Sequence, residues 1–543
     1  MDSPAGRKSV LTRLFARKGI DRLQADAEGT THLKRSLTAT DLVLLGIGAI
    51  VGAGIFLTVG TAAAGDAIRP GAGPAIALSF VLTAFACAFA ALCYAEMASM
   101  IPSAGSAYTY AFATLGELVA WVIGWDLLIE YAAGNVAVAI SWSGYFQELL
   151  RSGGQFILGH PLGLPEWLVH GYRGAPPGLL EAAPKIAGIP VLFNLPAVVV
   201  VLGLTVILVI GVRESVRFNA VMVGVKLIVL LFFMIVGATY FDLNNWFPKD
   251  APSAWAGYAP NGFPGIMTGA AIVFFAYIGF DAVSTAAEEA KNPGRDVPIG
   301  ILGSLVVCTA IYVAVAMVLT GMTSWKGLNT PEPLATALAD KGLAWASMVV
   351  AFGSVVAHTA VLLVFQMGQP RIFFAMSRDG LLPAWCSKVH PKYGTPHVTT
   401  ILTGLVVAGL SAFFPVDEIV DLTNIGTLFA FVLVCGGVLV LRVVEPERHR
   451  PFRTPLVWVS APLGIGACLF LMSYLPAVTW LRFGLWLLAG LVIYFCCVIW
   501  NGELQANGMA RGKARAITLA AATALIALFI YSVLHFDLWN RLT

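Results

Sequence analysis

The chain has 543 residues, of which 58% are hydrophobic and only 12% are charged. A soluble protein of this size carries about 25% charged residues to cover its surface, so the composition argues against a soluble fold and indicates a polytopic membrane protein. The formal net charge of +3 is too small to indicate a class of partner, and we expect no nucleic acid.

The N-terminal segment, residues 1–35, is basic and lacks the apolar core and cleavage site of a signal peptide, so we interpret it as a cytoplasmic tail. Thirteen apolar stretches follow, each predicting a helix in the bilayer. The third and eighth stretches are longer than a helix needs to cross the bilayer perpendicularly, so we expect them to tilt or to extend into the cytoplasm. The predicted helices are 41–64, 74–99, 116–149, 192–212, 218–240, 263–288, 298–320, 343–376, 396–414, 419–442, 456–475, 481–500 and 514–535.

The basic residues between these stretches predict the orientation. With the N-terminus inside, 23 of the 33 Lys and Arg residues lie on the cytoplasmic side, nine lie on the opposite side, and Lys226 lies within a span. By the positive-inside rule, this excess predicts a cytoplasmic N-terminus. An odd number of helices then places the C-terminus outside.

The first predicted helix contains the sequence GAIVGAGIFLTVG, and residues 46–54 include four glycines. Glycine disfavours helix, so we expect this span to be interrupted. If the chain consists of two inverted halves, the helix that opens the second half should be interrupted too. That helix contains GAAIVFFAYIGFD, which is glycine-rich and ends on the acid Asp281. Close packing is the alternative explanation for each cluster alone, but two clusters in corresponding positions favour paired breaks.

Breaks of this kind leave unpaired backbone groups inside the membrane, where water does not satisfy them. The half-helix that starts near Gly54 presents N–H groups and the positive end of a helix dipole, which suit a carboxylate. The half-helices that end near Ile50 and Phe275 present C=O groups, which suit an ammonium group. An α-amino acid carries both charges on one carbon, so it is the predicted ligand.

Four motifs together resemble the cationic amino acid transporter family of the amino acid–polyamine–organocation superfamily, in its bacterial form. They are GIGAIVGAGIF, YAEMASMIPSAGSAYTY, FFAYIGFDAVSTAAEEAKNPGRDVPIGI and GQPRIFFAMSRDGLLP, and the resemblance covers residues 36 to 450. It implies an all-α fold of the LeuT type with discontinuous helices 1 and 6. The implied units are a first inverted repeat at 36–240, a second at 263–443, and about three additional helices at 456–543.

The same resemblance implies a substrate site at the two breaks. Backbone groups of helix 1 hold the carboxylate and amine, and backbone groups of helix 6 complete the amine site, with Phe275 also acting as a gate. Position 53 is often Ser or Thr in similar proteins but is Ala53 here, so recognition of the carboxylate is expected to rest on main-chain N–H groups. The residues carried over are Ile50, Val51, Gly52, Ala53, Gly54, Phe275, Ala276 and Ile278.

Two ionisable residues within predicted spans are candidates for function. Lys226 lies about eight residues into helix 5, where a charge costs about 2.5–3.5 kcal/mol. By resemblance, it takes the place of a sodium ion and bridges helices 1 and 8, so it is expected to couple transport to protons. Glu130 lies one turn after Asp126 on helix 3 and resembles a family acid that lines the pocket, with structural hydrogen bonding as the alternative.

Two further residues have open roles as gating or pocket groups. Asp281 follows the helix 6 break, where it either satisfies freed backbone N–H groups or contacts substrate. His358, in GSVVAHTAVLLV, is either a packing residue or a pocket residue that affects substrate choice and pH response.

These features predict a secondary active importer that moves a neutral or cationic L-amino acid with a proton by alternating access. The alternatives are an exchanger or facilitative uniporter and, in another class, a non-transporting amino acid sensor. The chain contains neither HExxH nor a GxxxxGK[ST] phosphate loop, so we expect neither an enzyme nor ATP as the driver. We expect no metal or cofactor, and expect a bacterial inner membrane location with lipid, and a small membrane peptide, as candidate partners.

Overall fold

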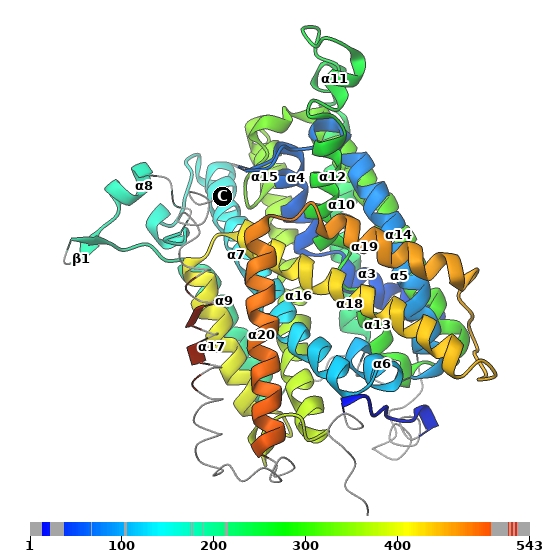
Figure 1. Ribbon diagram of the computed structural model, residues 1–543. Coiled ribbons are helices and arrows are strands. Elements are labelled where there is room, and N and C mark those ends of the chain that lie inside the picture. Colours follow the sequence, from blue (N-terminus) through cyan, green and yellow to red (C-terminus); the bar gives the residue numbers. More distant parts are fainter. Residues whose placement is uncertain are drawn as a thin grey trace, which may run out of the picture.

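The computed structural model describes residues 14–21, 37–66, 68–102, 106–173, 175, 177–186, 188–211 and 216–500, with isolated positions between 520 and 531. This part of the chain is an all-α membrane bundle, as predicted (Figure 1). Nine of its helical segments are long and apolar enough to cross a bilayer, and three shorter apolar helices occupy the remaining predicted positions up to residue 500. The thirteenth predicted helix, 514–535, falls largely outside the described residues.

The helices follow the predicted chain order. The first half contains α3 (Ala39–Ile50), α4 (Val59–Ala64), α5 (Ile76–Met100), α6 (Ser106–Thr114), α7 (Glu117–Leu158), α9 (Leu195–Ile210) and α10 (Val216–Ala238). The second half contains α12 (Gly262–Val273), α13 (Ala282–Thr285), α14 (Pro293–Met322), α15 (Pro333–Asp340), α16 (Ala344–Arg378), α17 (His397–Phe413) and α18 (Val416–Val444). Two more described helices are α19 (Val457–Met472) and α20 (Ala477–Trp500).

Local sequence signals explain where several helices begin. Thr38 and Asp41 form a capping box at the start of α3, in which the Asp41 carboxylate accepts the Thr38 N–H at 2.9 Å. Asn194 caps α9 by accepting the N–H of Ala197, and a proline follows within its first turn. These caps fix the ends of apolar segments whose interiors carry few signals of their own.

Three helical features differ from the sequence prediction. α7 continues to Leu158 rather than ending at 149, and Gly159, with φ +78°, follows its last residue. α6 is a separate, mostly buried helix in the segment after α5, and α15 is a further short helix before α16. Polar residues in these segments hid their helical character from a search for apolar stretches.

The bundle positions the broken helices at its centre. α7 packs along α16, whereas α14 packs against both α3 and α5. In Figure 1 the cyan α7 runs obliquely across the bundle. Outside the bundle, α8 (Pro177–Ala182) and a hairpin of β1 (Lys185–Ile186) and β2 (Ile189–Pro190) project to one side, and α11 (Ala254–Tyr258) projects at the top of the view.

Candidate functional site

The first predicted break is present in helix 1. α3 ends at Ile50, Val51 is extended with φ −74° and ψ 98°, and a π-helical turn at Gly54–Thr58 (η1) leads into α4. No hydrogen bond from the N–H of Gly52 or Ala53 is formed within the described residues. The break therefore offers main-chain donors next to a helix start, which suits an anionic group.

The second predicted break is present in helix 6. α12 passes into a 3₁₀ turn at Phe274–Tyr277 (η5), Ile278 is extended, and Gly279 has φ +123° before α13 begins. A positive φ of this size strains any residue with a Cβ, so glycine is required here. The 3₁₀ turn places Phe275 and Ala276 at the break.

The two breaks touch each other. A Cβ added to Gly54 would lie 2.2 Å from the Cα of Ala276, and one added to Gly279 would lie 2.8 Å from the carbonyl carbon of Ala49. On the other side of helix 1, a Cβ on Gly52 would lie 2.6 Å from a methyl group of Val361 on α16. The glycines thus allow two interrupted backbones to meet.

Tyr312 on α14 is a site residue that the sequence prediction missed. Its hydroxyl lies 2.8 Å from the carbonyl oxygen of Ile50 and 3.0 Å from that of Ala276. It therefore contacts both interrupted helices through backbone acceptors, including the Ile50 carbonyl that was assigned to the substrate ammonium. A carbonyl oxygen has two lone pairs, so each remains able to accept a second donor. A tyrosine in an apolar span, among several, gave no sequence signal.

Lys226 contacts helix 1 directly. Its side chain is 1% exposed, and its Nζ donates to the carbonyl oxygen of Gly48 at 2.7 Å, one turn before the break. Among the described residues, no carboxylate lies within ion-pair distance of this ammonium group. The contact joins α10 to α3, which is the helix 1 half of the predicted bridge, and α10 also packs on α16.

The acids lie on the α7 and α13 sides of the site. Glu130 and Asp126 are both buried, and in the described part of the chain neither Asp126 oxygen nor Glu130 Oε2 has a hydrogen-bond partner. Asp281 accepts the N–H of Gly279 at 3.2 Å, which is the structural role that the sequence left open. Buried carboxylate oxygens without partners are costly, so the Asp126 carboxylate and Glu130 Oε2 call for an explanation beyond packing.

His358 joins three elements beside the π-helical turn. Its Nδ1 lies 2.6 Å from the carbonyl oxygen of Ser354, and its Nε2 lies 2.9 Å from Oγ of Ser141 on α7. Because a carbonyl only accepts, Nδ1 carries a proton, and Nε2 of the neutral ring accepts from Ser141. The ring also packs on Phe56 and Tyr145, and the Tyr145 hydroxyl donates to the Phe56 carbonyl at 2.6 Å. His358 therefore contacts helix 1 through ring packing on Phe56, while its hydrogen bonds join α16 to α7.

An ionic cluster closes the end of the site near α4. Arg69 donates to Asp66 and, at 2.8 Å, to Asp421 on α18, and all three side chains are largely buried. Beneath Arg69, a cavity of about 10 Å³ lies between Thr58, Ile272 and Val420, which is space for about one water molecule. The sequence prediction missed this cluster, although an aspartate within the apolar helix 419–442 was a visible signal.

A second ionic cluster lies at the opposite end, where the quoted motifs meet. Glu96, at the end of α5, accepts hydrogen bonds from Nε and Nη2 of Arg442 on α18, at 3.0 and 2.7 Å. It also forms an ion pair with Arg450 at 3.2 Å. Asp379 after α16 accepts the Tyr108 hydroxyl of α6 at 2.9 Å. Charged groups therefore tie the helix ends together on both sides of the breaks.

Comparisons with known proteins agree with this geometry. Residues 37–500 match the model of the amino acid permease family. The chain is 46% identical to the branched-chain amino acid permease BcaP of Bacillus subtilis, over 89% of this chain and 97% of that protein. It is 44% identical to a methylthioribose transporter of the same organism, over 89% and 98% respectively. It is 38% identical to a vacuolar cationic amino acid transporter of Arabidopsis thaliana, over 80% and 68% respectively.

These relatives are transporters, in agreement with the prediction that the chain is not an enzyme, and the apolar helices make it an integral membrane protein. The match covers both broken helices and the ionic clusters at either end. The chain therefore belongs to the amino acid permease family of the amino acid–polyamine–organocation superfamily.

Proposed function

We propose that this protein imports an L-amino acid together with a proton, by alternating access around the two touching breaks. The single observation that carries the proposal is the contact of Gly54 with Ala276, which brings unpaired donors of helix 1 against the interrupted helix 6. The N–H groups of Gly52 and Ala53 supply the carboxylate site. The carbonyl oxygens of Ile50 and Ala276, shared with Tyr312, supply the amine site.

The walls of the site favour a neutral side chain. Val361 and Ala276 line the break of helix 1, and the Phe275 ring is 6% exposed. A branched apolar side chain would bury its surface here at about 0.8 kcal/mol per methylene group. The similarity to a branched-chain amino acid permease supports the same choice. A cationic substrate is the alternative, and the groups that would favour it are the Asp126 carboxylate and Glu130 Oε2, which have no hydrogen-bond partner among the described residues.

The proton-coupling role falls to Lys226. Its only hydrogen-bond partner among the described residues is the Gly48 carbonyl, which accepts from either the charged or the neutral amine. Loss of the proton would remove a buried charge beside helix 1 and weaken the tie between α10 and α3. The orientation with a cytoplasmic N-terminus, in a bacterial inner membrane, is part of the same proposal.

Binding by the purified protein tests the site. Branched-chain, small neutral and cationic amino acids, with methylthioribose as a further candidate, should be titrated by calorimetry in detergent. We expect binding of the branched-chain amino acids and no detectable binding to Gly54→Ala, because the new Cβ would meet backbone of helix 6. Gly52→Ala should weaken binding less, because its neighbour is a movable side chain of Val361.

The matched control is Gly436→Ala on α18, where an added Cβ meets nothing within 4 Å, so wild-type affinity is expected. Retained binding in Gly54→Ala would remove the helix 1 break from the site. Binding with no uptake into liposomes would instead identify a sensor, and uptake that ignores a proton gradient would identify an exchanger or uniporter.

A further inference from the structure

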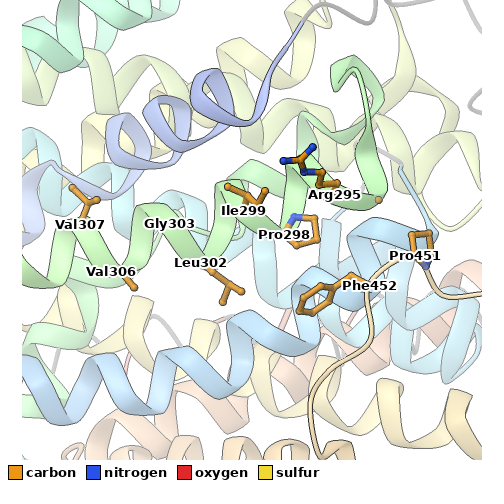
Figure 2. Close-up of a pocket in the computed structure, with 10 residues that line it drawn as sticks. Arg295, Pro298, Ile299, Leu302, Gly303, Val306, Val307, Pro451 and Phe452 are labelled. Atoms are coloured by element: carbon orange, nitrogen blue, oxygen red, sulfur yellow. The ribbon is translucent and has the colours of Figure 1, made fainter.

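A long apolar groove runs along the outer surface of α14, away from the substrate site. Its volume is about 690 Å³, and it extends from Gly294 to Val307 beside the loop at Pro451 and Phe452 (Figure 2). Ile299, Leu302 and Val306 lie along it, and Arg295 stands at one end. The groove is therefore apolar along its length and charged at one end.

The groove is long enough to span one leaflet of a bilayer. Thirteen helical steps from 294 to 307 span about 20 Å at 1.5 Å per residue, whereas half of a hydrocarbon core is about 15 Å. The groove is therefore long enough to take the extended acyl chain of a lipid in one leaflet.

The charged end of the groove has an unpaired cation. Arg295 is exposed, and its side chain makes no ion pair or hydrogen bond with any residue that the structure describes. Lys291, four residues earlier, and Arg453, directly after Phe452, are exposed as well. The nearby Asp296 carboxylate instead accepts the backbone N–H of Asn292 at 3.1 Å. The groove therefore ends at an exposed guanidinium group, that of Arg295, which pairs with no described side chain.

The geometry points to a binding site for an anionic phospholipid, with one acyl chain in the α14 groove and its phosphate on Arg295. Basic pockets at helix ends attract anionic headgroups, particularly in the cytoplasmic leaflet, where the proposed orientation puts Arg295. A zwitterionic lipid has the same acyl chains, but its headgroup also carries a positive charge, which Lys291 and Arg453 would repel. The positive charge of Arg295 therefore favours an anionic headgroup, and the apolar groove binds the acyl chain.

The helix that lines the groove, α14, packs against the first half of helix 1. A Cβ on Gly303 would lie 3.0 Å from Val43 of α3, so α14 and α3 are in close contact beneath the acyl chain. A bound lipid would stabilise this pair of helices from the membrane side.

Native mass spectrometry of the full-length protein tests the site. The protein is released from micelles that contain equal amounts of phosphatidylglycerol and phosphatidylcholine, and the retained lipids are counted. Wild type should retain one phosphatidylglycerol in preference to phosphatidylcholine. Arg295→Gln should reduce this preference about fivefold, as expected for loss of one cation near the headgroup, and Arg295→Lys should largely keep it.

Two matched controls separate the groove from general membrane contact. Val306→Trp fills the groove and should reduce retention, whereas Ile228→Trp, at a position on α10 of similar exposure (67% against 69%), should not. Arg371→Gln removes another exposed arginine, on α16, and should have no effect. An unchanged headgroup preference in Arg295→Gln, equal losses in both tryptophan variants, or a retained polypeptide instead of a lipid would overturn the assignment. Because no step measures transport, the result is independent of the proposed function.

Discussion

Individual buried polar residues hold helix 1 in its interrupted form. Lys226 reaches the Gly48 carbonyl, Tyr312 reaches the Ile50 carbonyl, and Tyr145 reaches the Phe56 carbonyl. Each comes from a different helix, and the Gly48 and Ile50 carbonyls lie where the break removes the backbone donors that an uninterrupted helix would supply. The break is thus stabilised by side chains of α10, α14 and α7, while the donors of Gly52 and Ala53 stay unpaired.

Replacing His358 tests whether its ring supports the site or only fills space. His358→Leu should lower the free energy of unfolding by about 1–3 kcal/mol, because it leaves the buried Ser354 carbonyl and Ser141 hydroxyl without the ring as a partner. Thermal unfolding in detergent measures this loss. Phe352→Leu, at a position 58% exposed on the same helix, should change stability little. Equal stability of His358→Leu and wild type would show that the two hydrogen bonds contribute nothing.

Glu332, directly before α15, predicts a pH dependence of stability. Burial and the nearby carboxylate of Glu148 raise the pKa of Glu332 from 4.5 to about 7. Between these values the folded protein keeps a proton that the unfolded chain releases, so stability falls as the pH rises from 4.5 and levels off above 7. Glu332→Gln should reduce the loss of melting temperature between pH 5 and pH 8. Glu181→Gln, at an exposed position on α8, should retain the wild-type pH dependence, and identical profiles for all three proteins would refute the assignment.

At the scale of elements, glycine clusters were the most informative sequence signal. They predicted both interruptions, and the structure shows why the glycines are needed: a Cβ added to Gly54 would lie 2.2 Å from the Cα of Ala276, and Gly279 has φ +123°. The end of α7 was predicted too early, at 149, because Arg151 and the two glycines that follow it interrupt the apolar stretch. α6 and α15 were missed because short polar helices have no apolar stretch to reveal them.

The candidate site was predictable in its backbone but not in its side-chain partners. Lys226 and His358 stood out because they are ionisable groups in apolar segments. Tyr312, Ser141 and Arg69 did not, because their roles depend on contacts with residues far away in the sequence. Such pairings come from the packing of helices, on which a single sequence carries no direct information. The boundaries of the two repeats, 36–240 and 263–443, stay predictions.

The ion pair between Arg69, in the α4–α5 connection, and Asp421 on α18 should control access to the site from the α4 end. Arg69→Gln leaves the buried Asp421 without its cation, which costs about 3–5 kcal/mol for a buried pair and should favour opening. A cysteine placed at Thr61, which lines the small cavity, should then react faster with a maleimide. Glu445→Gln, which removes a more exposed ion pair with Arg448, should leave the labelling rate unchanged. An unchanged rate in Arg69→Gln would show that this link does not close the site.

At the scale of the whole molecule, ionic clusters lie on both sides of the two breaks. Arg69 with Asp421 ties one end, and Glu96 with Arg442 ties the other, and α18 contributes to both. A transporter that alternates access must release one end while it keeps the other. Under the proposed function, α18 would hold either end by charge, and proton transfer at Lys226 would change the contact of α10 with helix 1.

The central claim is that Lys226 couples amino acid uptake to protons. The most direct test is uptake of labelled amino acid into proteoliposomes, with and without an inward proton gradient. Wild type should accumulate substrate above equilibrium only with the gradient. Lys226→Met should lose this accumulation, while Lys249→Met, at an exposed position, should retain it. Gradient-driven accumulation by Lys226→Met at the wild-type level would contradict the account.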